Sequence, residues 1–350
     1  MKKMIALFLA LVLALGLMAC GSKEPAAKEP AESQTQAPAE QAPAEEPAAE
    51  EPAETPAADA FVVGICQLVQ HPALDAATQG FMDALTEKLG DAVTFDVQNA
   101  SGDSNACSII VNSFVSKNVD LIMANATPAL QAAASATMDI PILGTSVTEY
   151  GVALGIEGFT GTVGGNISGT SDLAPLDEQA AMLVELFPEA KNVALIYCSA
   201  EPNSQYQVDV VKAELEAKGL TAELYAFSDS NDLAAVANAA CGFADVIYVP
   251  TDNTVASSAE ILDGVARPAG IPVIAGEEGI CAGCGVATLS ISYYDLGYQT
   301  GVMAAQILTG EADISTMPVA YAPQFTKKYN ASACEDLGVA IPEDYVAIEG

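Results

Sequence analysis

The sequence predicts an α/β protein built from two similar lobes, each with a parallel β-sheet. From residue 61 onward, short apolar runs alternate with helix-patterned segments, which is typical of βαβ units. The pattern also occurs twice. Residues 119–147 and residues 244–279 each give a strand, a polar turn, an alanine-rich helix, an Ile-Pro strand and a second polar turn. An internal repeat of this size indicates two Rossmann-like lobes of the same architecture.

The first 20 residues resemble a bacterial lipoprotein signal peptide. A basic start (MKK) is followed by the apolar run IALFLALVLALGL and by LMAC, which ends at Cys20. The apolar run is too short for a transmembrane helix, which needs about 20 residues. We expect Cys20 to be acylated and to become the first residue of the mature chain, because two or more acyl chains anchor a protein stably. This predicts a lipid-anchored protein on the extracytoplasmic face of the bacterial cell membrane.

Residues 21–58 consist almost entirely of Ala, Pro, Glu, Ser, Gln and Lys. Without large apolar side chains, such a segment cannot offset the entropy lost on ordering. We therefore expect a disordered, extended tether that holds the globular part away from the membrane.

The strand and helix candidates follow one another closely in both halves. Apolar residues recur at helical spacing after His71 and Pro72, and proline suits the first turn of a helix. The predicted strands are residues 61–66, 93–98, 119–124 and 140–145 in the first half, and residues 192–198, 221–227, 244–249 and 271–276 in the second.

Polar side chains follow these strands. In open α/β sheets, ligands bind beyond the carboxyl ends of the strands, so two facing lobes would enclose a polar cleft. The candidate ligand-binding residues are Gln67, His71, Pro72, Asn99, Thr127, Thr145 and Ser146 in the first lobe, and Tyr197, Ser199, Asn203, Ser204, Asp252, Asn253 and Glu277 in the second. Ser171, Asp172 and Glu201 belong to the same wider set of polar loop residues.

This set suits a zwitterion. Helix N-termini behind Thr127, Ser146 and Ser204 would bind a carboxylate, and Asp252 or Glu277 would pair with an ammonium. The alternative is that these polar residues only cap helices and form turns. A wall for an aromatic ligand is available from five residues that packing explains equally well: Tyr197, Tyr248, Tyr293, Tyr294 and Phe159.

Enzymatic and metal-binding functions are not expected. His71 is the only histidine, so it has no second histidine with which to bind a metal, and no G-x-S-x-G or G-x-G-x-x-G motif accompanies it. Cys281 and Cys284 have C-x-x-C spacing without a second pair, which leaves a local disulfide or two free thiols. We expect His71 to shape the loop at the cleft rim and no cofactor to be bound. The net charge of −34 argues against nucleic-acid binding.

Several ordered motifs resemble one known family. They are HPALDAATQGF, QNASGDSNA, ANATPALQAAASATMDIP, SGTSDLAP, VALIYCSAEPNSQ, IYVPTDNTV and YYDLGYQTGVMAAQILTGE. Together they are similar to the ABC-transporter substrate-binding lipoproteins of the tryptophan/tyrosine type, within the type I periplasmic binding proteins. The resemblance covers residues 61–350.

The resemblance implies a two-lobed flytrap joined by a three-stranded hinge, with crossings near residues 168–172, 290–293 and 318–323. The first lobe would then comprise residues 59–170 and 291–318, and the second lobe residues 171–290 and 319–350. It also implies an amino-acid ligand, commonly aromatic, and the permease and ATPase subunits of an ABC importer as partners of a monomeric receptor.

Two other functions remain as alternatives. A nucleoside-binding lipoprotein of the basic-membrane-protein type shares the architecture and the anchor, but it needs aromatic stacking, and the chain has no tryptophan. A surface α/β hydrolase or oxidoreductase shares the framework, but the motifs that would support it are missing from the sequence.

Overall fold

The structure is a computed structural model that describes residues 60–348. The predicted signal peptide, Cys20 and the tether of residues 21–58 lie outside the described residues. None of the helices within residues 60–348 is long and apolar enough to cross a membrane.

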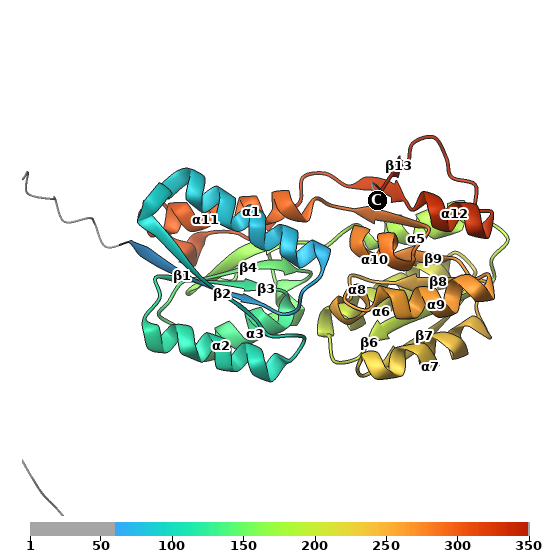
Figure 1. The fold of residues 1–350 in the computed structure, drawn as a ribbon, viewed down its shortest axis with the longest axis horizontal. Helices are drawn as coiled ribbons and strands as arrows, with labels where there is room; N and C mark the ends of the chain where they lie inside the picture. The colour runs from blue at the N-terminus through green and yellow to red at the C-terminus, as the bar shows by residue number, and fades with distance from the viewer. Residues whose placement is uncertain (1–59, 349–350) are drawn as a thin grey trace, which may run out of the picture. The chain divides into compact units, whose positions relative to one another are not determined.

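Two β-sheets organise residues 60–348, and helices cover them (Figure 1). The first sheet has the strand order β11-β5-β4-β3-β1-β2, and every neighbouring pair is parallel. Its strands are β1 (Phe61–Gln67), β2 (Val93–Asn99), β3 (Leu121–Asn125), β4 (Ile142–Val147), β5 (Ile167–Ser171) and β11 (Ala320–Tyr321).

The second sheet has the order β13-β12-β10-β9-β8-β6-β7 and is parallel except between β10 and β12. Its strands are β6 (Asn192–Cys198), β7 (Thr221–Phe227), β8 (Val246–Val249), β9 (Val273–Ala275), β10 (Ala287–Ser290), β12 (Thr326–Tyr329) and β13 (Val346–Ala347). The run β9-β8-β6-β7 has the same relative order as β4-β3-β1-β2 in the first sheet, which confirms the two similar α/β lobes predicted from the repeat.

Helices connect the strands and mostly begin at a residue that caps them. The α-helices are α1 (Pro72–Leu89), α2 (Ser104–Lys117), α3 (Thr127–Ala136), α4 (Tyr150–Leu154), α5 (Leu176–Leu186), α6 (Pro202–Ala217), α7 (Ser230–Cys241), α8 (Asn253–Ala256), α9 (Ala259–Ala269), α10 (Glu278–Cys284), α11 (Tyr293–Leu308) and α12 (Ala331–Leu337). Two short 3₁₀ helices, η1 (Gly90–Ala92) and η2 (Ile314–Thr316), follow α1 and α11.

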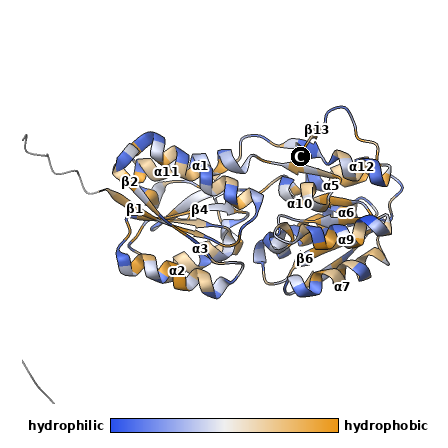
Figure 2. Ribbon diagram, in the orientation of Figure 1, coloured by the Kyte–Doolittle hydropathy of each residue, from blue (hydrophilic) through white to orange (hydrophobic). Residues whose placement is uncertain are grey.

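The central strands are buried on both faces. Every residue of β3, β4 and β8 is buried, as expected for parallel strands with helices on both sides. Figure 2 shows apolar residues concentrated in the two sheets and on the helix faces turned toward them. Each lobe therefore has its own core, which holds the carboxyl ends of its strands in fixed positions.

The chain passes between the sheets three times. The passages lie between β5 and α5, between β10 and α11, and between β11 and β12. Parallel pairing of β11 with β5 places Ser171, Ala320 and Tyr321 in the first sheet, whereas the predicted boundaries assigned them to the second lobe.

Helix α11 returns to the first lobe and packs closely against α1 (Figure 1). A Cβ added at Gly297 would lie 1.9 Å from the carbonyl oxygen of Ala77, and one at Gly301 would lie 2.5 Å from that of Phe81. These two glycines therefore permit the close contact between the helices. The contact fixes the first residue of α11, Tyr293, near the carboxyl end of β5.

Candidate ligand-binding site

Segments that follow the strands of both lobes meet at a small, nearly filled cavity of about 10 Å³, called the inner cavity below. The first lobe contributes six of the lining residues: His71, Leu74, Ser146, Thr148, Asp172 and Tyr293. The second lobe contributes the other six: Asn203, Thr251, Asp252, Asn253, Ala256 and Glu277. Its position is the one expected for ligands of open α/β sheets.

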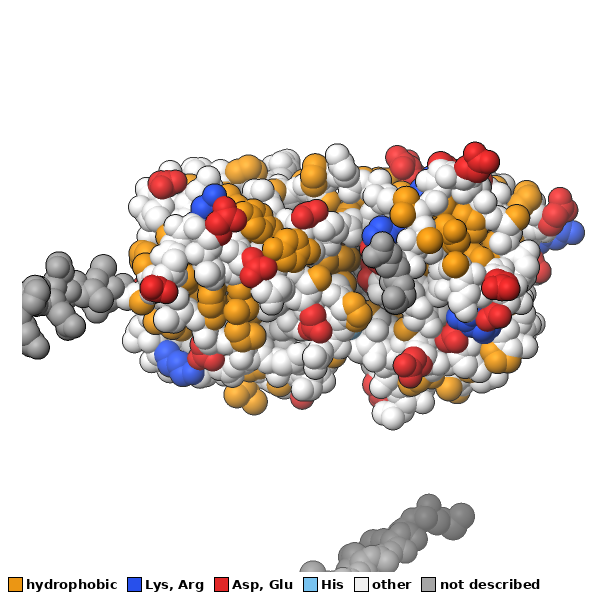
Figure 3. Space-filling view, turned by 45° about the horizontal axis from the view of Figure 1, so that its top comes forward, with side chains coloured by type: hydrophobic (Ala, Val, Ile, Leu, Met, Phe, Trp, Pro, Cys, Tyr) orange, Lys and Arg blue, Asp and Glu red, His pale blue; other side chains and the backbone are white. Residues whose placement is uncertain are grey.

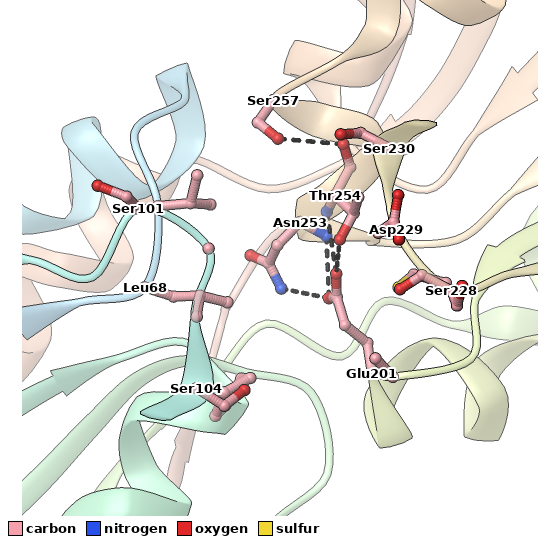
Figure 4. Close-up of a pocket in the computed structure, with 15 residues that line it drawn as sticks. Leu68, Ser101, Ser104, Glu201, Ser228, Asp229, Ser230, Asn253, Thr254 and Ser257 are labelled. Carbon is pink, nitrogen blue, oxygen red and sulfur yellow. Dashed lines mark hydrogen bonds between the residues drawn. The ribbon is translucent and has the colours of Figure 1, made fainter. Parts of the chain in front are cut away.

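A larger pocket of about 280 Å³ adjoins it and shares Asn253 with it (Figure 4). Leu68, Val69 and Pro128 of the first lobe give this outer pocket one apolar side. The second lobe gives it a polar side: Glu201, Ser228, Asp229, Ser230, Asn253, Thr254 and Ser257.

Three buried carboxyl groups line the inner cavity. Asp172, Asp252 and Glu277 are each at most 5% exposed, and no ion pair among residues 60–348 includes any of them. Their burial distinguishes them from the many acidic side chains that lie exposed on the surface in Figure 3.

Burial raises the pKa values of all three carboxyl groups. It raises the pKa of Asp172, and it raises the pKa values of Asp252 and Glu277 to about 7 each. At Asp252 the nearby Glu201 adds to the increase. A positively charged group in the cavity would remove the cost of ionising these carboxyls.

Two of the three carboxylates are already occupied as helix caps. Asp252 accepts hydrogen bonds from the backbone N–H of Cys198 at 2.7 Å and of Val255 at 2.9 Å. Glu277 accepts from the N–H groups of Gly279 and Ile280 at the start of α10. The observed contacts of Asp252 and Glu277 are those of helix-capping residues, which is the alternative to ligand binding that the sequence allows.

Asp172 is bound differently. Its Oδ2 accepts a hydrogen bond from the hydroxyl of Tyr293 at 3.0 Å, while its Oδ1 has no partner within the protein. It is therefore the carboxylate of the three that keeps an acceptor atom available inside the cavity.

Four buried polar atoms around the inner cavity lack a partner in the protein. They are His71 Nδ1, Ser146 Oγ, Asp172 Oδ1 and Asn203 Oδ1, and each residue is at most 6% exposed. Buried polar atoms are nearly always hydrogen-bonded, so four such atoms around one cavity indicate a site built for a polar ligand. Ser146 also has a left-handed φ of 54°, an uncommon conformation that clusters at functional sites.

The structure places six of the predicted site residues around the inner cavity: His71, Ser146, Asn203, Asp252, Asn253 and Glu277. Others bond within their own lobe. Gln67 bonds to Val69, Asp75 and Thr78, Thr145 to Thr170, Ser199 to Phe227, and Asn99 to Ser101. Pro72, Thr127, Tyr197 and Ser204 line neither the inner cavity nor the outer pocket.

Asp172 was predicted from the sequence only as one of the polar loop residues and not as a candidate ligand-binding residue. Tyr293 was considered only as part of an aromatic wall. Tyr293 is the one member of that wall which lines the inner cavity. Tyr197 and Tyr248 pack in the core of the second lobe. The sequence signal for Asp172 was its position at the end of a strand where the chain leaves the first sheet. In α10, Cys281 and Cys284 are free thiols.

The family model of ABC transporter substrate binding proteins matches residues 62–348 of this chain. The chain belongs to this family. A tyrosine-binding protein of Clostridioides difficile strain R20291 is 39% identical over 260 residues, which cover 73% of this chain and 75% of that protein.

Two solved structures add a structural comparison. An ABC domain in complex with L-Trp from Streptococcus pneumoniae is 32% identical, has a TM-score of 0.77, and the match covers 81% of this chain and 96% of that one. The ligand-free, open structure of a substrate binding protein with adhesive properties from Clostridium difficile is 38% identical, has a TM-score of 0.64, and the match covers 83% and 99% of the two chains.

The chain is therefore a substrate-binding protein of an ABC transporter and not an enzyme. Proteins of this kind act outside the cytoplasm together with the other components of the transporter.

Proposed function

We propose that this protein is the receptor of an ABC importer for an amino acid, whose ammonium group it binds in the inner cavity between its two lobes and whose side chain it binds in the outer pocket. One observation carries the proposal: three buried carboxyl groups, and four unpartnered polar atoms of which one belongs to Asp172, surround a cavity that has no lysine or arginine in its lining. An α-ammonium group supplies the missing positive charge.

The ammonium is assigned to Asp172, because it is the one of the three carboxyl groups with an oxygen that accepts no hydrogen bond within the protein. The negative charges of Asp252 and Glu277 still favour a cation in the cavity at longer range. Arg267 forms ion pairs with Asp263 and Asp336 elsewhere, so the ligand carboxylate is bound without a guanidinium. Ser146 Oγ is the unpartnered hydroxyl that suits this carboxylate.

The outer pocket suits the ligand side chain. Its apolar side would contact a ring, and its hydroxyl-rich side would accept a polar substituent. Two comparisons support an aromatic amino acid: the tyrosine-binding relative and the L-Trp complex.

Cys20 would carry the lipid anchor, and residues 21–58 would let the receptor reach the permease and ATPase subunits of the importer. Replacing Cys20 with alanine should release the protein from the membrane fraction without changing its ligand affinity. Retention of that variant in the membrane fraction would contradict the anchor.

The test of the proposed function is calorimetric titration with L-tyrosine, L-tryptophan, L-phenylalanine and adenosine. We expect at least one aromatic amino acid to bind and adenosine not to compete. Binding of adenosine alone would support the nucleoside receptor instead, and turnover of any ligand during the titration would contradict a receptor without enzymatic activity.

A further inference from the structure

The hydrogen bonds around His71 determine which of its ring nitrogens carries a proton. Glu201 is 4% exposed, and its carboxylate accepts four hydrogen bonds. Asn253 donates two of them, from its backbone N–H at 3.0 Å and its side-chain Nδ2 at 2.6 Å. Thr254 donates the other two, from its backbone N–H at 2.9 Å and its hydroxyl at 2.8 Å. Figure 4 shows Glu201 joined to both residues.

These contacts fix the orientation of the Asn253 amide. A carboxylate only accepts hydrogen bonds, so the Asn253 nitrogen faces Glu201 and its oxygen faces away. That oxygen lies 3.3 Å from His71 Nε2. Because an amide oxygen also only accepts, Nε2 must carry the proton and donate.

The other nitrogen of His71 then becomes an acceptor. Burial lowers the pKa of His71, which keeps the ring neutral, and a neutral ring protonated at Nε2 has a lone pair on Nδ1. His71 Nδ1 has no partner within the protein, and His71 is one of the residues that line the inner cavity.

Two further acceptors are fixed in the same cavity. Asn203 donates from Nδ2 to the carbonyl oxygen of Thr251 at 3.1 Å and toward the Ser204 hydroxyl at 3.4 Å, so its unpartnered atom is the oxygen Oδ1. Asp172 uses Oδ2 for Tyr293 and leaves Oδ1 free. The cavity thus offers three acceptor atoms, two from the first lobe and one from the second.

We propose that the inner cavity selects a primary ammonium group through His71 Nδ1, Asp172 Oδ1 and Asn203 Oδ1, and that Glu201 and Asn253 set the His71 tautomer this requires. A primary ammonium has three N–H donors, one for each acceptor. An N-methylated amine has two, and its methyl group would face a polar, closely packed wall. This inference rests on the proposed amino-acid receptor and specifies the substituents that its ammonium site accepts.

The first test is titration with L-tyrosine and with N-methyl-L-tyrosine, with the L-tryptophan pair in parallel. We expect the N-methyl compound to bind about tenfold to hundredfold more weakly, since a hydrogen bond to a charged group is lost. Equal affinities would overturn the selection of a primary ammonium. Failure of every parent amino acid to bind would instead overturn the proposed function.

Two substitutions of His71 test the roles of its two ring nitrogens separately. The side-chain amide of Gln reaches the position of Nε2 and retains the contact with Asn253, whereas the shorter Asn places an acceptor near the position of Nδ1. We expect His71→Asn to bind L-tyrosine within a few-fold of the wild type and His71→Gln to lose about tenfold. The reverse order, with both variants melting as the wild type does, would show that the contact with Asn253 matters instead of the acceptor.

The tautomer itself is measurable without any ligand. Because His71 is the only histidine, a ¹⁵N spectrum of the imidazole region of the full chain, carrying no histidine tag, needs no assignment. We expect a neutral ring protonated at Nε2 at pH 7, and a shift of the Nδ1 signal when L-tyrosine is added. A ring protonated at Nδ1, or at both nitrogens, would overturn the proposal even if amino acids bind.

Discussion

The two lobes bring acidic side chains to the same cavity but use them in different ways. In the second lobe, Asp252 and Glu277 each accept two backbone N–H bonds and hold the start of a short helix. In the first lobe, Asp172 is held by one hydroxyl and keeps one oxygen free. Residue type and position at a strand end are therefore not enough to identify a ligand contact. What distinguishes the three carboxylates is how many of their acceptor positions the protein already occupies.

Replacing Asp172 with asparagine should have the largest effect on binding. The substitution keeps the shape of the side chain but removes the charge that would pair with the ligand ammonium. We expect the affinity for an aromatic amino acid to fall by about 2–5 kcal/mol, as when one partner of a buried, hydrogen-bonded charge pair is removed. Calorimetry measures the loss, and a melting curve verifies the fold. Affinity within threefold of the wild type would show that the ammonium binds elsewhere.

The pH dependence of binding tests all three carboxyls together. The pKa values of Asp252 and Glu277, raised to about 7, mean that the ligand-free cavity retains protons up to near pH 7, and the raised pKa of Asp172 acts in the same direction. An ammonium binds best after these protons leave. Affinity should therefore rise from pH 5.5 to 8, by up to about tenfold per pH unit for each proton released.

Other titratable groups near the cavity do not change this sign. The lowered pKa of His71 favours the neutral ring, and Tyr293, with its raised pKa, stays protonated. Asp75 beside His71, Glu201 behind Asn253 and Glu278 beside Glu277 are the remaining acidic neighbours. Titrations in buffers of different ionisation enthalpy count the protons released, and an affinity that does not vary with pH would contradict this role of the carboxyls.

The sequence predicted the lobes better than it predicted the site. Strands, helices and the repeat follow from local apolar patterns, and the strand order of both sheets agrees with them. The contacts of the site depend on residues far apart in the chain. Tyr293 reaches Asp172 across 121 positions and His71 reaches Asn253 across 182, and no local pattern records either contact.

Contacts that local sequence patterns do not record also explain why some predicted site residues do not reach the cavity. Gln67 lies at the end of β1, where ligand contacts are expected, but neighbouring groups take its amide: Val69, Asp75 and Thr78. Thr145 likewise bonds to Thr170 in the adjacent strand. Strand-end position selects a group of polar residues, and only packing decides which of them keep a free atom.

Tyr293 and Tyr294 are adjacent, and replacing each with phenylalanine gives a matched pair of variants. The expected effect on binding is smaller than that of Asp172→Asn. The hydroxyl of Tyr293 donates to Asp172 in the cavity, while that of Tyr294 donates to Asp83 on the surface at 2.9 Å. Tyr293→Phe should weaken binding by about 0.5–1.5 kcal/mol, because Asp172 loses the donor that orients it. Tyr294→Phe should leave the affinity unchanged. Equal effects of the two variants would show that the Tyr293 hydroxyl does not orient the ligand contact.

The capping carboxylate Glu277 should show the smallest change in affinity and a clear change in stability. Glu277→Ala removes the acceptor for two N–H groups of α10 and should lower the free energy of unfolding by about 0.5–2 kcal/mol. Glu149 caps α4 outside the inner cavity and the outer pocket, so Glu149→Ala is the matched control for stability. Urea unfolding of the ligand-free variants and calorimetric titration of each separate the two properties. We expect both variants to lose stability and Glu277→Ala to lose less than tenfold in affinity. An affinity loss as large as that of Asp172→Asn would place Glu277 in direct contact with the ammonium and remove the distinction between the lobes.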